Sequence, residues 1–273
     1  GTPVRFFDRG QRKPAGQGEI VSVDWNNGRL AGATFRLNSG RAAKGGFAMW
    51  DLTPFSLRGE KIFTRVCDDL MGAAAICCVL DELGRGRHDD VRVWGLFTRA
   101  EEIGFLGAVE AIRRKYIPKT AAVISLECSR ALPQTPQGGG VIVRVGDLSS
   151  IFDPDLSEAL RAAAVRLSET DDSFKYMRAL MDGGTCEATP FCDEGYRASG
   201  LAIPLGNYHN QAVERDGKPT IGAENVHVGD FLSEVRLLLE LARHPETLAP
   251  RRGRTDRMKR LFATARKELK PLP

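Results

Sequence analysis

The chain has 273 residues, of which 42% are apolar and 27% are charged, as in an ordinary globular protein. Its 39 basic and 35 acidic residues leave a net charge of +4, which is too small to suggest a nucleic-acid partner. No apolar run approaches the length that crosses a membrane, and no signal peptide is visible. We therefore expect neither a nucleic-acid nor a membrane partner.

The six cysteines include no Cys-x-x-Cys pair, and Cys77 and Cys78 are adjacent within an apolar helical run. In a chain of this size, such a pattern is typical of reduced thiols in a protein core rather than of a disulfide framework. We therefore expect a cytoplasmic protein.

Residues 1–58 predict a small β-rich domain. They are rich in glycine and contain β-type stretches such as EIVSVDW (19–25) and LAGATFRL (30–37), which turn signals such as NNG separate. We expect a barrel-like domain that is incomplete in this sequence.

Residues 59–273 predict an α/β domain with a mostly parallel sheet, because β-type and helical stretches alternate. The expected helices include 70–83, 153–169 with Asp153 or Asp155 as its cap, and 223–244, and the basic segment 251–270 predicts a surface helix. The expected strands are VRVWGLFT (91–98), AAVISLE (121–127), GGGVIVRVGD (138–147) and GLAIPLG (200–206).

Polar residues follow several of these strands, where the ligand crevice of such a sheet forms. They are Asp68 and Asp69 after KIFTRV, Glu101 and Glu102 after 91–98, Glu127 at the end of 121–126, and His209 after 200–205. Carboxylates that converge with a histidine offer the oxygen and nitrogen ligands of a zinc-type metal site. One of two adjacent glutamates could then bind metal while the other acts as a general base.

Simpler interpretations of the same residues stay open. Asp68 could cap the helix that follows it, and Glu101 with Glu102 could be a solvated first helical turn. Glu127 could begin a loop, and His209 could be an ordinary loop histidine.

Four motifs in this order resemble those of one family. CDDLMG (67–72) resembles the Asp-Asp-x-x-Gly motif of the zinc exopeptidases with two co-catalytic metals, and AEEIGFLGA (100–108) resembles their Glu-Glu motif. MDGGTCEA (181–188) and IPLGNYHN (203–210) are similar to the Gly-Gly-Thr and Pro-x-Arg-Tyr-x-His segments of the tetrahedral, or glutamyl, aminopeptidases. The match extends over residues 45–245, and this family also inserts a small β-barrel before the Asp-Asp motif.

The resemblance implies a three-layer α/β core and a metal-dependent aminopeptidase acting on peptides. Two divalent ions are implied, zinc or else cobalt or manganese, with Asp68 as the bridging ligand and Glu102, Glu127 and His209 as ligands of single ions. Glu101 would be the general base, and Asp69 would support the turn. Gly183, Gly184 and Thr185 are the candidates for substrate contact, and the two glycines could instead simply allow a tight turn into the next helix. The family often forms homo-oligomers.

Departures from the family keep alternatives open. The family has a further metal-binding histidine before the barrel, but no histidine occurs between residues 1 and 87, so we expect it upstream of Gly1. Glu127 stands where aminopeptidases of the superfamily usually have Asp, which favours a carboxypeptidase or an N-acyl deacylase. Cys186 and Glu187 replace the Asp of the Gly-Gly-Thr motif, and a catalytically degenerate peptide-binding protein is the third alternative.

Overall fold

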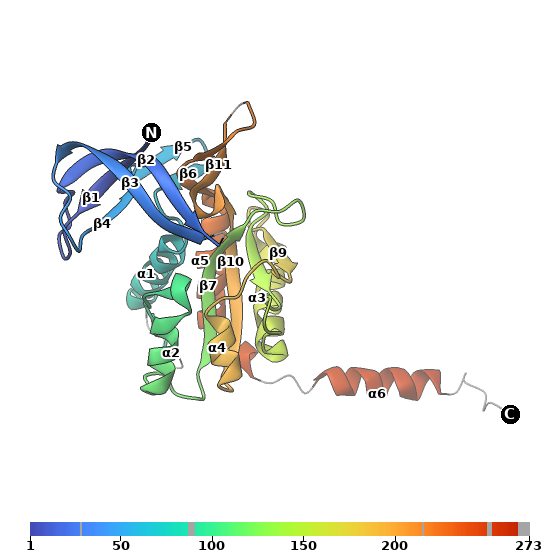
Figure 1. The fold of residues 1–273 in the computed structure, drawn as a ribbon. Helices are drawn as coiled ribbons and strands as arrows, with labels where there is room; N and C mark the ends of the chain where they lie inside the picture. Colours follow the sequence, from blue (N-terminus) through green and yellow to red (C-terminus); the bar gives the residue numbers. More distant parts are fainter. Residues whose placement is uncertain (28, 87–90, 215, 250–252, 267–273) are drawn as a thin grey trace. The chain divides into compact units, whose positions relative to one another are not determined.

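The computed structural model describes residues 1–27, 29–86, 91–214, 216–249 and 253–266 (Figure 1). They divide into two units. The first unit comprises Gly1–Leu70 and Leu205–Val228, and the second comprises Met71–Pro204 with the described residues from Gly229 onward.

An antiparallel sheet in the first unit has the strand order β3–β2–β1–β4. Its strands are β1 (Thr2–Phe7), β2 (Gly16–Asn26), β3 (Arg29–Gly40) and β4 (Phe47–Trp50). Val4, Phe6 and Phe7 of the central strand β1 are buried, and Phe6 packs edge-on against Phe35 at 5.5 Å between ring centroids. The predicted β-rich region is therefore a sheet with β3 and β4 at its edges, and closure into a barrel stays a prediction.

A second set of strands in the first unit carries the segments that surround Asp68 and His209. β5 (Phe55–Arg58), β6 (Lys61–Thr64) and β13 (Glu224–His227) pair antiparallel, and β13 also pairs with the last residues of β10 (Arg197–Gly206). β11 (Gln211–Val213) and β12 (Pro219–Ile221) form a separate hairpin. The helix predicted from residue 223 begins only at Val228, because residues 224–227 pair with β6 instead.

The sheet of the second unit is mixed. β8 (Val141–Arg144) is parallel to β9 (Tyr176–Ala179) but antiparallel to β10, and β7 (Ala122–Arg130) also pairs with β10. Because the pairs β6–β13, β13–β10 and β10–β8 are all antiparallel, the prediction of a mostly parallel sheet for residues 59–273 is wrong. Apolar β-type stretches indicate where strands lie, but they do not encode the direction in which two strands meet.

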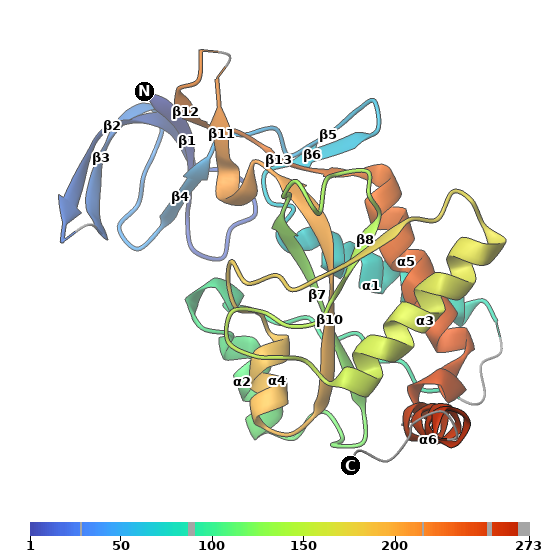
Figure 2. The same ribbon diagram turned by 90° about the vertical axis from the view of Figure 1, so that its right-hand side faces the viewer.

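Helices of the second unit pack around β10 in two clusters (Figure 2). Leu201 lies in a buried cluster with residues of α3 (Pro154–Thr170) and α5 (Val228–Arg243). Ala198 lies in another cluster with residues of α2 (Leu106–Arg113) and α4 (Ala188–Asp193). Positions 198 and 201 face opposite sides of the strand, because side chains alternate along it. The side chain of Asp153 caps α3 by accepting the Leu156 N–H at 2.7 Å, as the sequence predicts.

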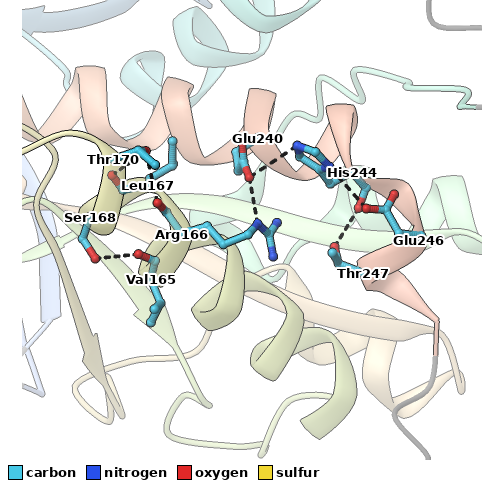
Figure 3. Close-up of polar contacts among 9 residues, drawn as sticks. All are labelled: Val165, Arg166, Leu167, Ser168, Thr170, Glu240, His244, Glu246 and Thr247. Carbon is cyan, nitrogen blue, oxygen red and sulfur yellow. Dashed lines mark hydrogen bonds and ion pairs between the residues drawn. The ribbon is translucent and has the colours of Figure 1, made fainter.

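Polar contacts join α3 to α5 near the C-terminal end of α5 (Figure 3). Nε of Arg166 donates to Oε1 of Glu240 at 2.9 Å, and Nε2 of His244 lies 3.7 Å from the same oxygen. Nδ1 of His244 lies 3.2 Å from Oε1 of Glu246, in the 3-10 turn that follows (Pro245–Leu248). The Thr247 hydroxyl donates a hydrogen bond to the carbonyl oxygen of His244. These contacts hold the ends of two core helices together.

Residues 91–98 do not form the predicted buried strand. No strand pairs with this segment within the described part of the chain, and Trp94 and Phe97 are exposed. Gly95 packs against α1 (Leu70–Gly84), where a Cβ atom would lie 2.5 Å from Cγ2 of Ile76. A strand is defined by its hydrogen-bonded neighbour, which an apolar sequence alone does not supply.

Cys77 and Cys78 on α1 are exposed, so they are not the core thiols that the sequence predicted.

The predicted C-terminal surface helix is present as α6 (Gly253–Ala265), and its side chains from 257 onward are exposed. Residues 251, 252 and 267–270 of the predicted helix lie outside the described residues. Among the described helices, none combines the length and apolar character required to cross a membrane.

Candidate active site

Asp68 and His209 lie together in the first unit. Nε2 of His209 is 3.7 Å from Oδ2 of Asp68, and the side chains are 42% and 12% exposed. Asp68 follows β6, and its peptide bond to Asp69 is cis. A carboxylate oxygen and an imidazole nitrogen at this separation are suited to bind a divalent ion in common.

The loop that carries His209 has an unusual backbone. Asn207, His209 and Asn210 all have positive φ, at 53°, 53° and 60°, a conformation that asparagine tolerates better than most residues. Nδ2 of Asn210 donates to the carbonyl oxygen of Arg65 at 2.9 Å. The loop is thus attached to the segment that leads into Asp68, and this attachment sets the position of His209.

Glu224, at the start of β13, holds the backbone around Asp68. Its side chain is buried, and Oε2 accepts the N–H groups of Cys67 at 2.6 Å and Asp68 at 3.1 Å. Hydrogen bonds to an ionised acceptor are among the stronger ones in proteins. Glu224 therefore fixes the turn from which the Asp68 side chain projects.

Glu101 and Glu102 lie in the second unit, on the 3-10 turn η1 (Glu101–Ile103). The turn is preceded by Ala100 at φ 63° and followed by Gly104 at φ 110°. The N–H groups of Gly104 and Phe105 both donate to the carbonyl oxygen of Glu101. The paired glutamates thus sit on a tight irregular turn rather than in the first turn of a regular helix.

The pKa of Glu101 is raised to about 7. Burial is the largest cause, the negative charges of Glu102 and Glu187 add to it, and the guanidinium of Arg144 opposes it. A carboxyl group that titrates near neutral pH can both accept and release a proton during a reaction. This property suits the base role that the sequence suggested for Glu101.

Glu127 lies inside β7, which continues to Arg130, so the expectation that Glu127 ends its strand is wrong. Hydrogen-bonded pairing, here with β10, decides where a strand ends, and the end of the apolar run does not. Oε1 of Glu127 accepts the Ser125 hydroxyl at 3.4 Å, and its charge acts on the thiol of Cys186. Burial raises the pKa of Cys186 to about 12, so this thiol stays protonated.

The turn with Gly183, Gly184 and Thr185 is held against the end of β8 by Asp147. Burial favours a raised pKa for Asp147, but the bonds it accepts from the Thr189 hydroxyl and from backbone N–H groups outweigh burial and lower its pKa. A Cβ atom at either glycine would meet nothing within 4 Å, so this backbone borders open space. The Thr185 hydroxyl bonds the Ser149 hydroxyl at 2.6 Å.

Glu187 and Arg144 belong to the same site but were missed as functional candidates. Glu187 is half-buried and accepts a hydrogen bond from Thr98, yet its Oε1 has no hydrogen-bond partner among the described residues. Arg144, on β8, is buried with its guanidinium over the Phe152 ring at 5.7 Å. Their charges act on Glu101, so they help to set its pKa. Position 187 stood out in the sequence only as a departure from a motif.

Each unit therefore brings part of the predicted ligand set together. The first unit joins Asp68 to His209, and the second carries Glu101 beside Glu102 on one turn. Glu127 lies in the second unit as well, on β7, and its charge acts on the Cys186 thiol. The donor atoms are carboxylate oxygens and one imidazole nitrogen, which fit zinc, cobalt or manganese.

Comparisons with known proteins agree with these features. The M42 glutamyl aminopeptidase family matches residues 41–216, which is more than half of the chain. An aminopeptidase from the archaeon Desulfurococcus kamchatkensis is similar in structure, with a TM-score of 0.69 and 20% identity over 91% of this chain and 70% of that one. A TET aminopeptidase from a marine-sediment Thaumarchaeota archaeon is also similar, with a TM-score of 0.69 and 20% identity. The similarity covers 91% of this chain and 72% of that one.

A third similar structure is the TET1 peptidase of Pyrococcus horikoshii, described as assembling into a tetrahedron or a large octahedral shell. Its TM-score is 0.61 at 21% identity, over 89% of this chain and 72% of that one. At such identities the structural similarities show the fold alone, a mixed α/β fold. The sequence has no match among curated proteins.

Proposed function

The chain belongs to the M42 glutamyl aminopeptidase family and is a metal-dependent aminopeptidase, and we propose that it removes N-terminal residues from peptides with Glu101 as the general base. Asp68, Glu102, Glu127 and His209 would hold two divalent ions, with Asp68 between them. One observation carries this proposal: Nε2 of His209 lies 3.7 Å from Oδ2 of Asp68. These two kinds of metal ligand come from distant parts of the sequence.

The chain's own residues would act as follows. Glu101 takes a proton from the attacking water and gives it to the departing amine, which its pKa of about 7 supports. The open backbone at Gly183 and Gly184, with Thr185, contacts the peptide. When bound, the ions would acidify the water and polarise the scissile carbonyl.

The first test is the number of ions bound per chain, measured by elemental analysis after loading with zinc or cobalt. We expect about two equivalents, as in other co-catalytic sites. A chain that binds none would remove the two-ion site and favour the peptide-binding alternative.

Substrate class is tested with three matched peptides: one free at both ends, one acetylated at its N-terminus and one amidated at its C-terminus. An aminopeptidase cleaves the first and third and spares the acetylated peptide. The identity of Glu127 favours a carboxypeptidase or N-acyl deacylase as the second candidate. Cleavage of the acetylated peptide, or loss of activity on the amidated one, would support that candidate instead.

The organisation of the protein forms part of the proposal. Clusters on opposite faces of β10 support a three-layer catalytic domain at 59–273, and the antiparallel sheet supports a barrel-like domain at 1–58. The assembly described for the Pyrococcus horikoshii peptidase supports a homo-oligomer. A cytoplasmic location agrees with the finding that the six cysteines form no disulfide among the described residues.

A further inference from the structure

The helix α6 has an apolar side that is largely exposed (Figure 1). Met258, Leu261 and Phe262 are 62%, 53% and 61% exposed, and Ala265 is exposed as well. Because a helix has 3.6 residues per turn, these four positions form one continuous stripe that spans about 100° of its circumference. We call Met258, Leu261, Phe262 and Ala265 the apolar stripe.

Cationic side chains border the apolar stripe on both sides. The helical period places Lys259 and Arg266 along one border, Arg257 along the other border and Arg260 on the opposite side of the helix. All four side chains are exposed, and residues 257–266 contain no acidic residue. The described side chains of α6 therefore make an amphipathic helix whose polar side is purely cationic.

The total charge of the chain conceals how basic this segment is. Residues 251–270 contain nine basic and two acidic residues, a net charge of +7, whereas the whole chain carries +4. The rest of the chain is therefore net negative. The expectation that the protein has no membrane partner rested on the total charge and on the lack of a spanning segment. Those two criteria do not test for a helix that lies on the surface of a membrane.

The helix α6 also has little that would stabilise it by itself. It is 13 residues long, and isolated helices of about this length are only marginally stable in water. Its described side chains are exposed, so packing against the rest of the unit contributes little to its stability. A surface that buries the apolar stripe would supply the missing stabilisation.

We infer that α6 binds the surface of an anionic lipid membrane, with the apolar stripe among the acyl chains and the bordering cations at the level of the headgroups. A nucleic acid would neutralise the cations but leave the stripe exposed, and a neutral lipid surface would leave the cations without counter-charges. An anionic lipid surface satisfies both sides of the helix. Arg and Lys side chains are long enough to reach the headgroups from the borders of such a stripe.

The test is co-sedimentation of the full chain with vesicles at physiological ionic strength. One set of vesicles contains phosphatidylcholine with about a third phosphatidylglycerol, and the other contains phosphatidylcholine alone. We expect binding to the anionic vesicles, at least about tenfold weaker binding to the neutral ones, and a decrease with added salt. Hydrogen exchange of the α6 amides should slow when anionic vesicles are added, because the bound helix opens less often.

The double variant Leu261→Gln with Phe262→Gln tests the apolar stripe without changing the charge or introducing a poor helix former. We expect its binding to anionic vesicles to be at least about tenfold weaker. Phe55→Gln with Leu57→Gln is the matched control, because these side chains on β5 are 63% and 60% exposed. The control should bind like the unmodified protein, and circular dichroism should show that both double variants are folded.

A second double variant, Lys259→Gln with Arg266→Gln, tests the cations while it leaves the apolar stripe intact. Its binding to anionic vesicles should weaken about tenfold, and its salt dependence should be smaller than that of the unmodified protein. Metal content and peptide hydrolysis should be unchanged in this variant and in the stripe variant, because the residues of α6 are not among the proposed site residues. The inference is therefore judged independently of the proposed function.

Three results would overturn the inference. An unmodified protein that stays in the supernatant with anionic vesicles would do so, and a groove of a partner protein would then be the better occupant for α6. Equal binding of the stripe variant and the unmodified protein would show that charge alone attracts the chain to lipid. Binding of a labelled DNA duplex that the stripe variant retains, in a protein that does not bind vesicles, would identify a nucleic-acid surface instead.

Discussion

Nε2 of His209 lies 3.7 Å from Oδ2 of Asp68, and each residue comes from a different part of the sequence of the first unit. Asn210 attaches the His209 loop to Arg65, and Glu224 attaches the Asp68 turn to β13. The pair is therefore positioned by the fold around it, and this positioning can be tested by substitution.

Replacing His209 by Gln should lower the metal content from about two ions per chain to about one, because one ion loses its only imidazole ligand in the proposed set. Elemental analysis after dialysis measures the change. His227→Gln is the matched control, since His227 lies 3.4 Å from Glu60 and is not among the proposed ligands. Equal metal content in both variants would remove His209 from the site.

Replacing Glu101 by Gln should lower kcat by roughly 10²–10⁴, the usual contribution of general acid–base catalysis, while metal content is unchanged. The amide keeps the shape of the side chain but cannot accept the proton. Glu110→Gln serves as control, because Glu110 lies on α2, forms an ion pair with Arg114 and is not among the proposed site residues. Near-normal turnover of the Glu101 variant would exclude it as the base.

The raised pKa of Glu101 predicts a pH-dependent stability of the metal-free protein. Its pKa is about 7 when folded and 4.5 as the reference for an unfolded chain, so between these values the folded chain holds a proton that the unfolded chain releases. The contribution of Glu101 to the free energy of unfolding is therefore greatest below pH 4.5 and is lost as the pH rises through 7.

Glu101→Gln removes this titration, so its melting temperature should change less between pH 5 and pH 8 than that of the unmodified protein, by about a few degrees. Calorimetry with a chelator present measures the difference. If the melting temperatures of the two proteins change by the same amount between pH 5 and pH 8, Glu101 does not have a raised pKa.

Replacing Glu224 by Gln should weaken metal binding by about 10–100-fold without removing a ligand, as changes to residues behind metal ligands typically do. The neutral amide accepts the Cys67 and Asp68 N–H groups less strongly, so the Asp68 side chain is held less firmly. A titration that follows activity against free metal should reach normal turnover at higher metal concentration.

The exposed Glu214 provides the control for this substitution, and Glu214→Gln should titrate like the unmodified protein. A Glu224 variant that never regains activity at saturating metal would indicate a direct role for Glu224 in the reaction rather than a role in positioning Asp68.

The sequence by itself determined the chemical types at the site and much of the scaffold. Paired acidic motifs, a loop histidine and the order of four motifs identified the family, because ligand chemistry depends on residue type and order. The cap at Asp153 and the helix α3 were also predictable, since both depend on local hydrogen bonds and on the 3.6-residue period.

Only the tertiary structure decided features that depend on distant partners. Residues 91–98 look like a buried strand but have no pairing strand among the described residues, and β8 runs antiparallel to β10. The raised pKa of Glu101 depends on burial and on the charges of Glu187 and Arg144, which no local pattern links to it. Burial, strand pairing and electrostatic coupling join residues far apart in the chain, so they follow from the fold.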